Sequence, residues 1–283
     1  MRFEKWQALG NDYIIVEQDE LPFELTLRRI EFLCAPHTGV GSDGILLLSR
    51  PETGDAVASL RIFNPDGSEA ELSGNGAREA ILYLRQRGWT GEDEFTLLTA
   101  AGEIRPRITG PTTCTVDMGR ASVRSKDFPR GGEDGTGSLE SGGRRFAFQH
   151  VAVGNPQCAI EVDAEELSQL DLQVYGPPIE NNELFPNRTN VSWFAELGPG
   201  RIRARIFERG VGETSASGTG ATGAAVAYVL DGGRSPVTVV LDGGELTVEV
   251  SEPDLQIKLT GWAVPVFRGA LADTFLEELH ATK

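Results

Sequence analysis

Two serines in two glycine-rich loops are the residues of this sequence best suited to chemistry. Ser73 lies in 69-EAELSGNGAREA-80, and Ser217 lies in 213-ETSASGTGATGAA-225. A helix that starts directly after each serine would point its free N–H groups and the positive end of its dipole at a ligand. Such loops suit a small carboxylate, because glycine lets the ligand approach the backbone closely. Either serine taken alone is better explained as the N-cap of its own helix.

An internal repeat relates the two loops to each other. The segment 61-RIFNPDGSEAELSGNGA-77 aligns with 205-RIFERGVGETSASGTGA-221, and 10-GNDYIIVE-17 aligns with 154-GNPQCAIE-161. Both alignments have the same offset of 144 residues, which is also the separation of the two serines. One offset shared by two separate segments indicates a duplicated unit. We therefore expect two similar halves that face each other across a pseudo-twofold axis, with the serines on opposite sides of one cleft.

Short strands, with one helix after each serine loop, are the predicted elements of both halves. Residues 77–88 and 221–233 predict helices that end in glycine, and the second is apolar on almost every face, which favours a buried, central position. We therefore expect a mixed α/β (α+β) fold with two pseudo-symmetric halves, each a mixed β-sheet or barrel wrapped around a central helix. The predicted strands include YIIVE, GILLLSR, SLRIFN, TLLTA, CTVDM, VTVVLD and ELTVEVS.

The composition of one segment sets the expected boundary between the halves. Residues 123–145 are rich in glycine, serine and charge, which is typical of a solvated loop or hairpin rather than core. We therefore expect an N-terminal half at 1–120, a connecting loop or hairpin at 121–144 and a C-terminal half at 145–262. The segment 263–283 is expected to complete the N-terminal half. Its stretch 269–281 has helical apolar spacing at Leu271, Phe275, Leu276 and Leu279.

The charge of the chain argues against two classes of partner. With 42 acidic and 26 basic residues, the formal net charge is −16, which disfavours binding to nucleic acid or to an anionic membrane surface. No apolar run approaches the roughly 20 residues that span a bilayer, and the opening MRFEKW has no apolar region of a secretion signal. We therefore expect a cytoplasmic protein that acts on a small molecule.

Neither a metal site nor a dinucleotide site is predicted. Cys34, Cys114 and Cys158 have no spacing typical of a disulfide framework or of metal ligands, so we expect them to be small buried hydrophobic residues. The run 39-GVGSDG-44 has the form G-x-G-x-x-G, but an apolar, strand-like run follows it instead of a helix. It therefore lacks the context that a dinucleotide fingerprint requires.

Five segments resemble diaminopimelate epimerase, and together they span nearly the whole chain. They are 8-ALGNDYIIVE-17, 61-RIFNPDGSEAELSGNGAR-78, 154-GNPQC-158, 188-RTNV-191 and 207-FERGVGETSASGTGA-221. The resemblance implies a cofactor-independent, two-base amino-acid epimerase with two pseudo-symmetric mixed α/β halves around central helices. It further implies conversion of LL- to meso-diaminopimelate, a step of lysine and peptidoglycan biosynthesis, and it fits a homodimer.

The reaction of this family explains why the fold is duplicated. To invert a carbon, one group must remove a proton from one face while another delivers a proton to the other face. Helix N-termini stabilise the carboxylate as it gains enolate character. By resemblance, Glu208 and Arg209 engage the distal end of the substrate or support the base. The other substrate-binding residues implied are Asn11, Asn64, Asn155 and Asn190 for polar groups, and Gly74, Asn75, Gly218 and Thr219 for the α-carboxylate.

The sequence departs from the family at the groups that move protons. The family has two cysteines where Ser73 and Ser217 stand here. A thiol has a reference pKa of about 8.5 and an alcohol is about 7 pKa units less acidic, so forming the alkoxide costs roughly 10 kcal/mol more. A helix dipole returns at most about 2 kcal/mol. The family's GNPH also reads GNPQ, so Gln157 replaces a group that titrates. Glu208 and Glu213 remain as carboxylate bases near Ser217.

Three hypotheses follow from these departures. The first is a diaminopimelate epimerase with impaired turnover, in which the serines act poorly or with help from a carboxylate. The second is a one-base isomerase, or a dehydratase of a hydroxylated amino acid, in which one face needs only a weak acid. The third is a protein that binds an amino acid without turnover. The catalytic candidates are Ser73, Ser217, Glu208 and Gln157.

Overall fold

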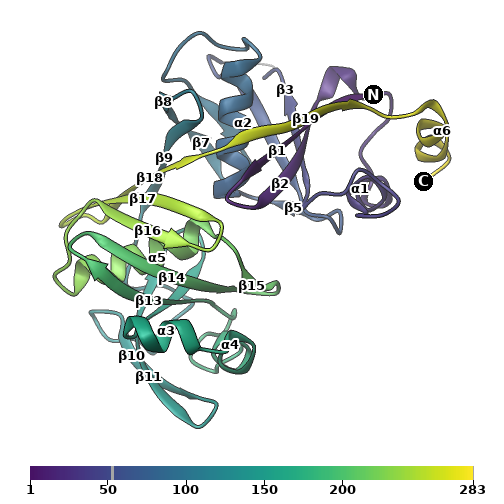
Figure 1. Ribbon diagram of the computed structural model, residues 1–283. Coiled ribbons are helices and arrows are strands. Elements are labelled where there is room, and N and C mark those ends of the chain that lie inside the picture. The colour runs from purple at the N-terminus through teal and green to yellow at the C-terminus, as the bar shows by residue number, and fades with distance from the viewer. Residues whose placement is uncertain (52–53, 283) are drawn as a thin grey trace. The chain divides into compact units, whose positions relative to one another are not determined.

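The computed structural model of the protein describes residues 1–51 and 54–282 and divides into two compact units (Figure 1). Unit 1 consists of Met1–Val116 with Gly261–Lys283, and unit 2 consists of Asp117–Thr260. Lys283, the last residue of the expected segment 263–283, lies outside the described residues. Both boundaries between the units fall inside strands, namely β9 (Thr113–Arg120) and β18 (Gln256–Trp262). The boundaries expected from the sequence lie instead where the composition changes.

Unit 1 is built on a mixed sheet with the strand order β19-β1-β2-β3-β4-β6-β7, and β5 pairs with β4. The β2–β3 and β4–β6 pairs are parallel. A further short strand, β8, pairs with the first half of β9. The strands are β1 (Arg2–Ala8), β2 (Asn11–Glu17), β3 (Ile45–Ser49), β4 (Ala58–Phe63), β5 (Glu69–Ala70), β6 (Leu97–Thr99), β7 (Gly102–Ile104), β8 (Arg107–Gly110) and β19 (Val264–Ala270).

Both faces of this sheet are buried, which explains the nearly continuous apolar runs of β2 and β3. On one face, α2 (Gly74–Gln86) contacts β1, β2, β3 and β19. On the other face, a core cluster joins Ile14 and Ile45 of the sheet to α1 and α6. The remaining helices of unit 1 are the 3-10 helix η1 (Gln18–Glu20), α1 (Leu27–Cys34) and α6 (Asp273–Ala281). The helix predicted over 269–281 therefore starts later, because Gly269 and Ala270 end strand β19.

Unit 2 repeats this plan with a larger mixed sheet. Its strand order is β10-β11-β12-β13-β14-β16-β17-β18, with β15 paired to β14, and the β12–β13 and β14–β16 pairs are parallel. The strands are β10 (Thr136–Ser141), β11 (Arg144–Ala152), β12 (Pro156–Glu161), β13 (Asn190–Gly198), β14 (Arg201–Glu208), β15 (Gly212–Thr214), β16 (Val237–Leu241) and β17 (Gly244–Ser251).

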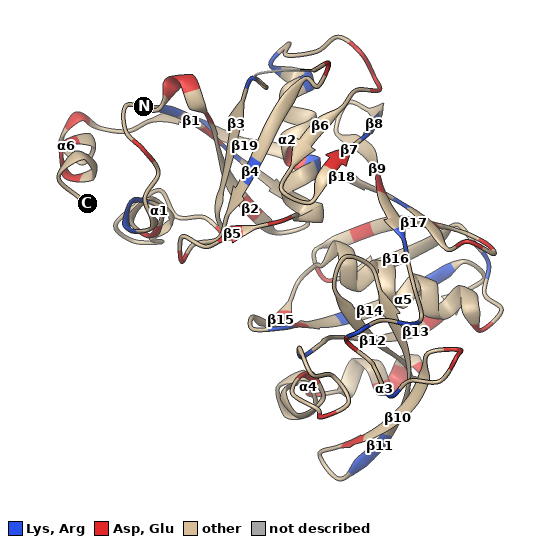
Figure 2. Cartoon of the chain, turned by 180° about the vertical axis from the view of Figure 1, so that it is seen from behind, with Lys and Arg blue, Asp and Glu red and all other residues tan. Residues whose placement is uncertain are grey.

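The central helix of unit 2 is α5 (Gly218–Leu230), which contacts six strands, β11 to β14, β16 and β17. Eleven of its residues are buried, and Figure 2 shows it without charged residues. The opposite face of the sheet is covered by α3 (Ala164–Gln169) and α4 (Leu172–Glu180), whose Leu167 and Ile179 join a core cluster with Trp193 of β13. Because nearly all of α5 is buried, its sequence is apolar on almost every face.

The segment between the predicted halves belongs to unit 2. Strand β10 pairs with β11 from Thr136↔Gln149 to Ser141↔Arg144, and Gly142 and Gly143 at the turn both have positive φ, as a two-residue hairpin of this kind requires. The expectation that the segment is solvated rather than core is wrong at two apolar positions, because Phe128 and Leu139 lie in the unit 2 core cluster. Isolated apolar residues among glycine and charge gave no periodic signal.

The predicted mixed α/β fold, with two halves around central helices, is confirmed. Helices α2 and α5 begin at Gly74 and Gly218 and end at Gln86 and Leu230, so the offset of 144 residues holds at both ends. The three cysteines are free and buried, as expected of small hydrophobic residues. Among the described residues, no helix is long and apolar enough to cross a membrane.

Candidate active site residues

Ser73 is the N-cap of α2 in unit 1. Its Oγ accepts a hydrogen bond from the backbone N–H of Gly76 at 3.1 Å. The phenolic O–H of Tyr13, on β2, is also within hydrogen-bonding distance of this oxygen, at 3.2 Å. The N-cap interpretation of Ser73 is therefore confirmed. Two donors directed at one hydroxyl oxygen also favour negative charge on that oxygen, which is the form that a proton-accepting group needs.

Ser217 is the equivalent N-cap of α5 in unit 2. Its Oγ accepts a hydrogen bond from the backbone N–H of Gly220 at 3.2 Å, and the residue is 4% exposed. The position equivalent to Tyr13 is Gln157, 144 residues further along the chain. Gln157 donates instead to Oδ1 of Asn155. The two serine loops therefore share the cap but differ in the side chain that adjoins it.

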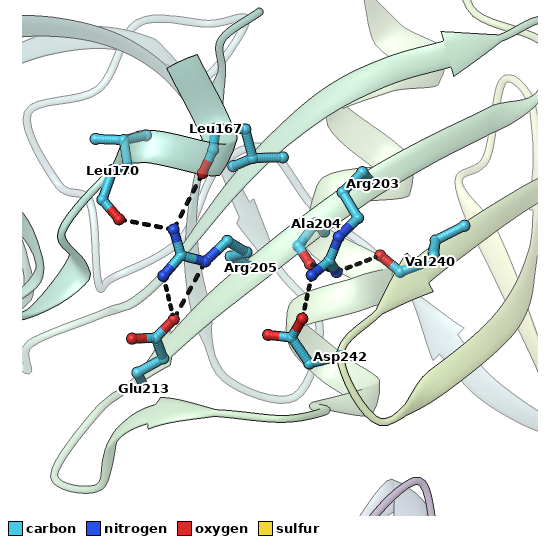
Figure 3. A network of polar contacts seen from close by, with 8 residues as sticks. All are labelled: Leu167, Leu170, Arg203, Ala204, Arg205, Glu213, Val240 and Asp242. Carbon is cyan, nitrogen blue, oxygen red and sulfur yellow. Dashed lines mark hydrogen bonds and ion pairs between the residues drawn. The ribbon is translucent and has the colours of Figure 1, made fainter. Parts of the chain in front are cut away.

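Matching ion pairs hold the hairpin that leads to each serine. In unit 1, Arg61 of β4 binds Glu69 of β5 through two hydrogen bonds of 2.9 and 2.8 Å. In unit 2, Arg205 of β14 binds Glu213 at 3.2 and 2.6 Å, as Figure 3 shows. These four residues obey the offset of 144 residues, so the pairs descend from one duplicated contact.

Further hydrogen bonds anchor Arg205 to the covering helix of unit 2. Its Nη1 donates to the carbonyl oxygens of Leu167 and Leu170, at the end of α3, at 3.0 and 2.6 Å (Figure 3). A helix end offers carbonyl groups without an intrahelical partner, and a guanidinium satisfies them well. Glu213 is therefore occupied in holding β15 against β14, which makes it a poor candidate for the base.

Three of the predicted unit 1 residues lie in two separate groups. Asn75, the second residue of α2, donates from Nδ2 to Oδ1 of Asn11 at 3.2 Å, so these two candidates are in contact. Asn64 instead donates to Oγ of Ser68 at 3.0 Å, within the turn that follows β4. The turn function that is ordinary for asparagine therefore accounts for this contact.

The predicted unit 2 residues also form two groups. In the first, Nδ2 of Asn155 donates to Oγ1 of Thr219 at 3.3 Å, and Gln157 contacts the same asparagine. In the second, Oδ1 of Asn190 accepts from the backbone N–H of Arg209 at 2.8 Å. This bond ties the end of β14, where Glu208 lies, to the start of β13.

Glu208 is the carboxyl group that the structure brings to Ser217. Burial raises the pKa of Glu208 above its ordinary value, and the hydroxyls of Thr214 and Ser217 act in the opposite direction. A carboxyl group with a raised pKa is a stronger base once it is ionised. In the repeat, the position equivalent to Glu208 is Asn64, which cannot titrate. The two halves therefore differ in acid–base capacity.

Three residues that contact the predicted ones were not predicted from the sequence. Tyr13 reaches Ser73, Arg78 binds Asn75, and Asp43 binds Asn11. Arg78 follows the SGNGA loop directly, so its place in the motif was a usable signal. Asp43 lies in 39-GVGSDG-44, a run considered only as a dinucleotide fingerprint, and its partner is 32 residues away in sequence.

A second buried carboxyl group lies on α2, one turn from the Ser73 loop. Glu79 is 0% exposed, and burial raises its pKa well above the ordinary value, while Arg78 acts in the opposite direction. Burial therefore outweighs the neighbouring charge, and folding favours the neutral form of Glu79 relative to the unfolded chain.

The variant Glu79→Gln is expected to remove a pH-dependent loss of stability. The folded state keeps a proton that the unfolded chain releases above about pH 4.3, so wild-type stability falls relative to the variant by about 1.4 kcal/mol per pH unit up to the folded pKa. Urea unfolding of both proteins at pH 4 and pH 7 measures this difference. A constant difference between the two pH values would show that Glu79 ionises normally in the fold.

Comparison with known proteins places these features in a family. The family model described as "Diaminopimelate epimerase" matches residues 3–124 and 149–265. A relative named diaminopimelate epimerase from Synechococcus sp. is 40% identical over 283 residues, covering 96% of this chain and 99% of that protein. One of the same name from Magnetococcus marinus is 41% identical over 276 residues, covering 95% of this chain and 96% of that protein.

Solved structures that share the fold carry several different names. A PhzF-family phenazine biosynthesis protein from Bacillus anthracis aligns with a TM-score of 0.68 at 20% identity, covering 96% of this chain and 99% of that one. A hydroxyproline epimerase from Agrobacterium vitis aligns with a TM-score of 0.68 at 16% identity, covering 96% of this chain and 90% of that one. At these identities the similarity establishes the fold.

Proposed function

The chain belongs to the diaminopimelate epimerase family, and from that premise we propose that it inverts the α-carbon of diaminopimelate between the LL and meso forms. The observation that carries the proposal is the pair of serines at equivalent positions of the duplicated halves, each capping a helix whose first turn contains glycine. The reaction would serve lysine and peptidoglycan biosynthesis in the cytoplasm, and a homodimer fits the family.

In this proposal each serine loop supplies one group for proton transfer. Ser73 and Ser217 take the positions of the family's two cysteines. The backbone N–H groups that begin α2 and α5, at Gly74, Asn75, Gly218 and Thr219, bind the α-carboxylate. As the α-proton leaves, negative charge spreads into this carboxylate, and preorganised N–H donors stabilise the charge most strongly at that stage.

The proton transfers themselves are the slow part of the proposed reaction. A serine hydroxyl is about 7 pKa units less acidic than a cysteine thiol, which corresponds to roughly 10 kcal/mol, while a helix dipole supplies about 2 kcal/mol at most. We therefore assign the base of the Ser217 face to Glu208, with the serine hydroxyl passing the proton. On the Ser73 face, the Tyr13 and Ser73 hydroxyls supply a weak acid.

A specific difference between the halves favours a second candidate function. The repeat places a carboxyl group at Glu208 and an amide at the equivalent Asn64, so one half has a base where the other has none. This arrangement fits a one-base isomerase, or a dehydratase of a hydroxylated amino acid that removes the α-proton on one face only. Binding of an amino acid without turnover is the third candidate.

Incubation in D₂O with LL-diaminopimelate and a panel of amino acids separates the three functions. Deuterium incorporation at the α-carbon with inversion, followed by NMR and chiral chromatography, is the expected result for the epimerase. Incorporation without inversion, or release of water, would support the one-base function. An increase in melting temperature with no incorporation would support binding alone, because a ligand that binds only the folded state stabilises it.

A further inference from the structure

A buried, charged arginine lies directly behind the Ser73 loop. Arg78 is 0% exposed, and its guanidinium donates to the carbonyl oxygen of Gly74 at 2.9 Å and to Oδ1 of Asn75. Burial lowers the pKa of Arg78 to about 10, so it stays charged at neutral pH. Burial also raises the pKa of the neighbouring Glu79, which favours the neutral form of that carboxyl group. A guanidinium has only donors, so the oxygen end of the Asn75 amide must face it.

The direction of this first bond determines the next two. With its oxygen on Arg78, the Asn75 amide presents nitrogen to Asn11, whose Oδ1 accepts at 3.2 Å. The Asn11 amide must then present its own nitrogen outwards, and Nδ2 donates to Oδ2 of Asp43 at 2.8 Å. An ionised carboxylate only accepts. A donor-only group at one end and an acceptor-only group at the other therefore impose one direction on the whole chain.

The corresponding contacts in unit 2 join neutral groups. Thr222 takes the place of Arg78 and donates its hydroxyl to the carbonyl of Gly218 at 2.8 Å. Thr219 takes the place of Asn75 and accepts from Nδ2 of Asn155, which is the reverse of the direction in unit 1. Hydroxyl and amide groups can donate and accept, so the charged ends are what distinguishes unit 1.

We propose that Arg78 and Asp43 are positioning residues that fix which ends of the Asn75 and Asn11 amides face the substrate. This inference rests on the proposed function and on the substrate-binding positions that the family resemblance gives to Asn11 and Asn75. An α-amino acid carries an ammonium group that needs acceptors and a carboxylate that needs donors. A reversed amide would set N–H against ammonium or oxygen against carboxylate and leave polar groups unpaired, which weakens binding.

Three single substitutions and one double substitution test the chain. Arg78→Met and Asp43→Ala each release one end, and each is expected to raise KM for diaminopimelate about tenfold. Asp43→Asn is expected to restore KM, because its side-chain oxygen can accept from both Asn11 and the Asp12 backbone as Asp43 does. The double variant Arg78→Met/Asp43→Ala is expected to have a KM no higher than that of Arg78→Met alone, because residues of one network do not act additively.

The matched control lies on the same helix. Arg85→Met removes bonds to the carbonyls of Thr90 and Gly91 at the far end of α2, and KM is expected to stay unchanged. A merely structural role for Arg78 would lower the melting temperature and the active fraction while leaving KM unaltered. Because Asp43 is exposed, its variants stay informative even if Arg78→Met does not fold.

Side-chain amide NMR of protein labelled with ¹⁵N-asparagine tests the inference without catalysis. Wild type is expected to show one well-dispersed pair of Nδ2 protons for Asn11 and one for Asn75, with the Asn11 pair broadened in Asp43→Ala and sharp again in Asp43→Asn. Unchanged Asn11 signals in Asp43→Ala would overturn the proposal. If wild type neither binds nor turns over diaminopimelate, the proposed function fails, while these spectra still decide whether the ends orient the amides.

Discussion

Replacement of Ser73 and Ser217 together by cysteine is expected to raise kcat for diaminopimelate epimerisation by about a thousandfold or more. The thiol pKa is about 7 units lower than that of an alcohol, and a thiolate at a helix N-terminus forms at moderate cost. The full difference of roughly 10 kcal/mol is not expected to appear, because Glu208 supplies part of the base function in the serine protein. Initial rates with LL-diaminopimelate, followed by appearance of the meso form, measure the gain.

The single substitutions and one nearby serine serve as controls for this result. Each single variant alone is expected to gain less than the double variant, since inversion needs a proton-transfer group on both faces. Ser215→Cys places an exposed thiol two residues from Ser217 and is expected to gain nothing. A wild-type kcat equal to that of the double cysteine variant would show that serine chemistry is not limiting.

Glu208→Gln is expected to lower α-proton exchange by the wild-type protein about 100-fold or more. A positioned general base contributes about 10²–10⁴ to the rate, and the amide of glutamine keeps the shape of the side chain without the base. Because burial raises the pKa of Glu208 and only the ionised form accepts a proton, wild-type exchange is expected to rise with pH through a value above the ordinary carboxyl range. Deuterium incorporation measured between pH 4 and pH 9 gives both quantities.

Glu213→Gln is the matched control, because it changes the other carboxyl group of the same loop. Glu213 is bound to Arg205 and not to the serine, so its variant is expected to lose some stability and to keep both the exchange rate and the pH profile. If both variants showed the same loss, or if Glu208→Gln kept the rising limb of the profile, the base would have to be another group.

The Gln157 position illustrates how a sequence departure gains meaning from its neighbours. In sequence, Gln157 is only the loss of a group that titrates. In the structure Gln157 is fully buried and packs against α5 at Gly223. A Cβ added at Gly223 would lie 2.8 Å from the Cβ of Gln157. Glycine at position 223 therefore leaves room for the glutamine, whose amide binds Asn155. These contacts indicate that Gln157 orients the side chain of Asn155.

The repeat was the strongest predictor of the fold, because a duplication appears in the amino-acid sequence itself as a constant offset between matching segments. It correctly related α2 to α5 and one serine cap to the other, and it extends to the ion pairs of Arg61 and Arg205. Local patterns did less well where an element is stabilised by distant partners. The buried Phe128 of the apparent loop and the strand at Gly269 are examples.

Sequence was enough to predict the two serine-capped helix starts, the central helices and the family, because caps, apolar periodicity and an internal repeat are visible along the chain. Tertiary structure alone decided which polar groups meet. One directed chain joins Asp43, Asn11, Asn75 and Arg78 only because β2, α2 and the loop before β3 bring them together. The raised pKa of Glu208 has the same origin, since desolvation depends on what packs around a side chain and not on its neighbours in sequence.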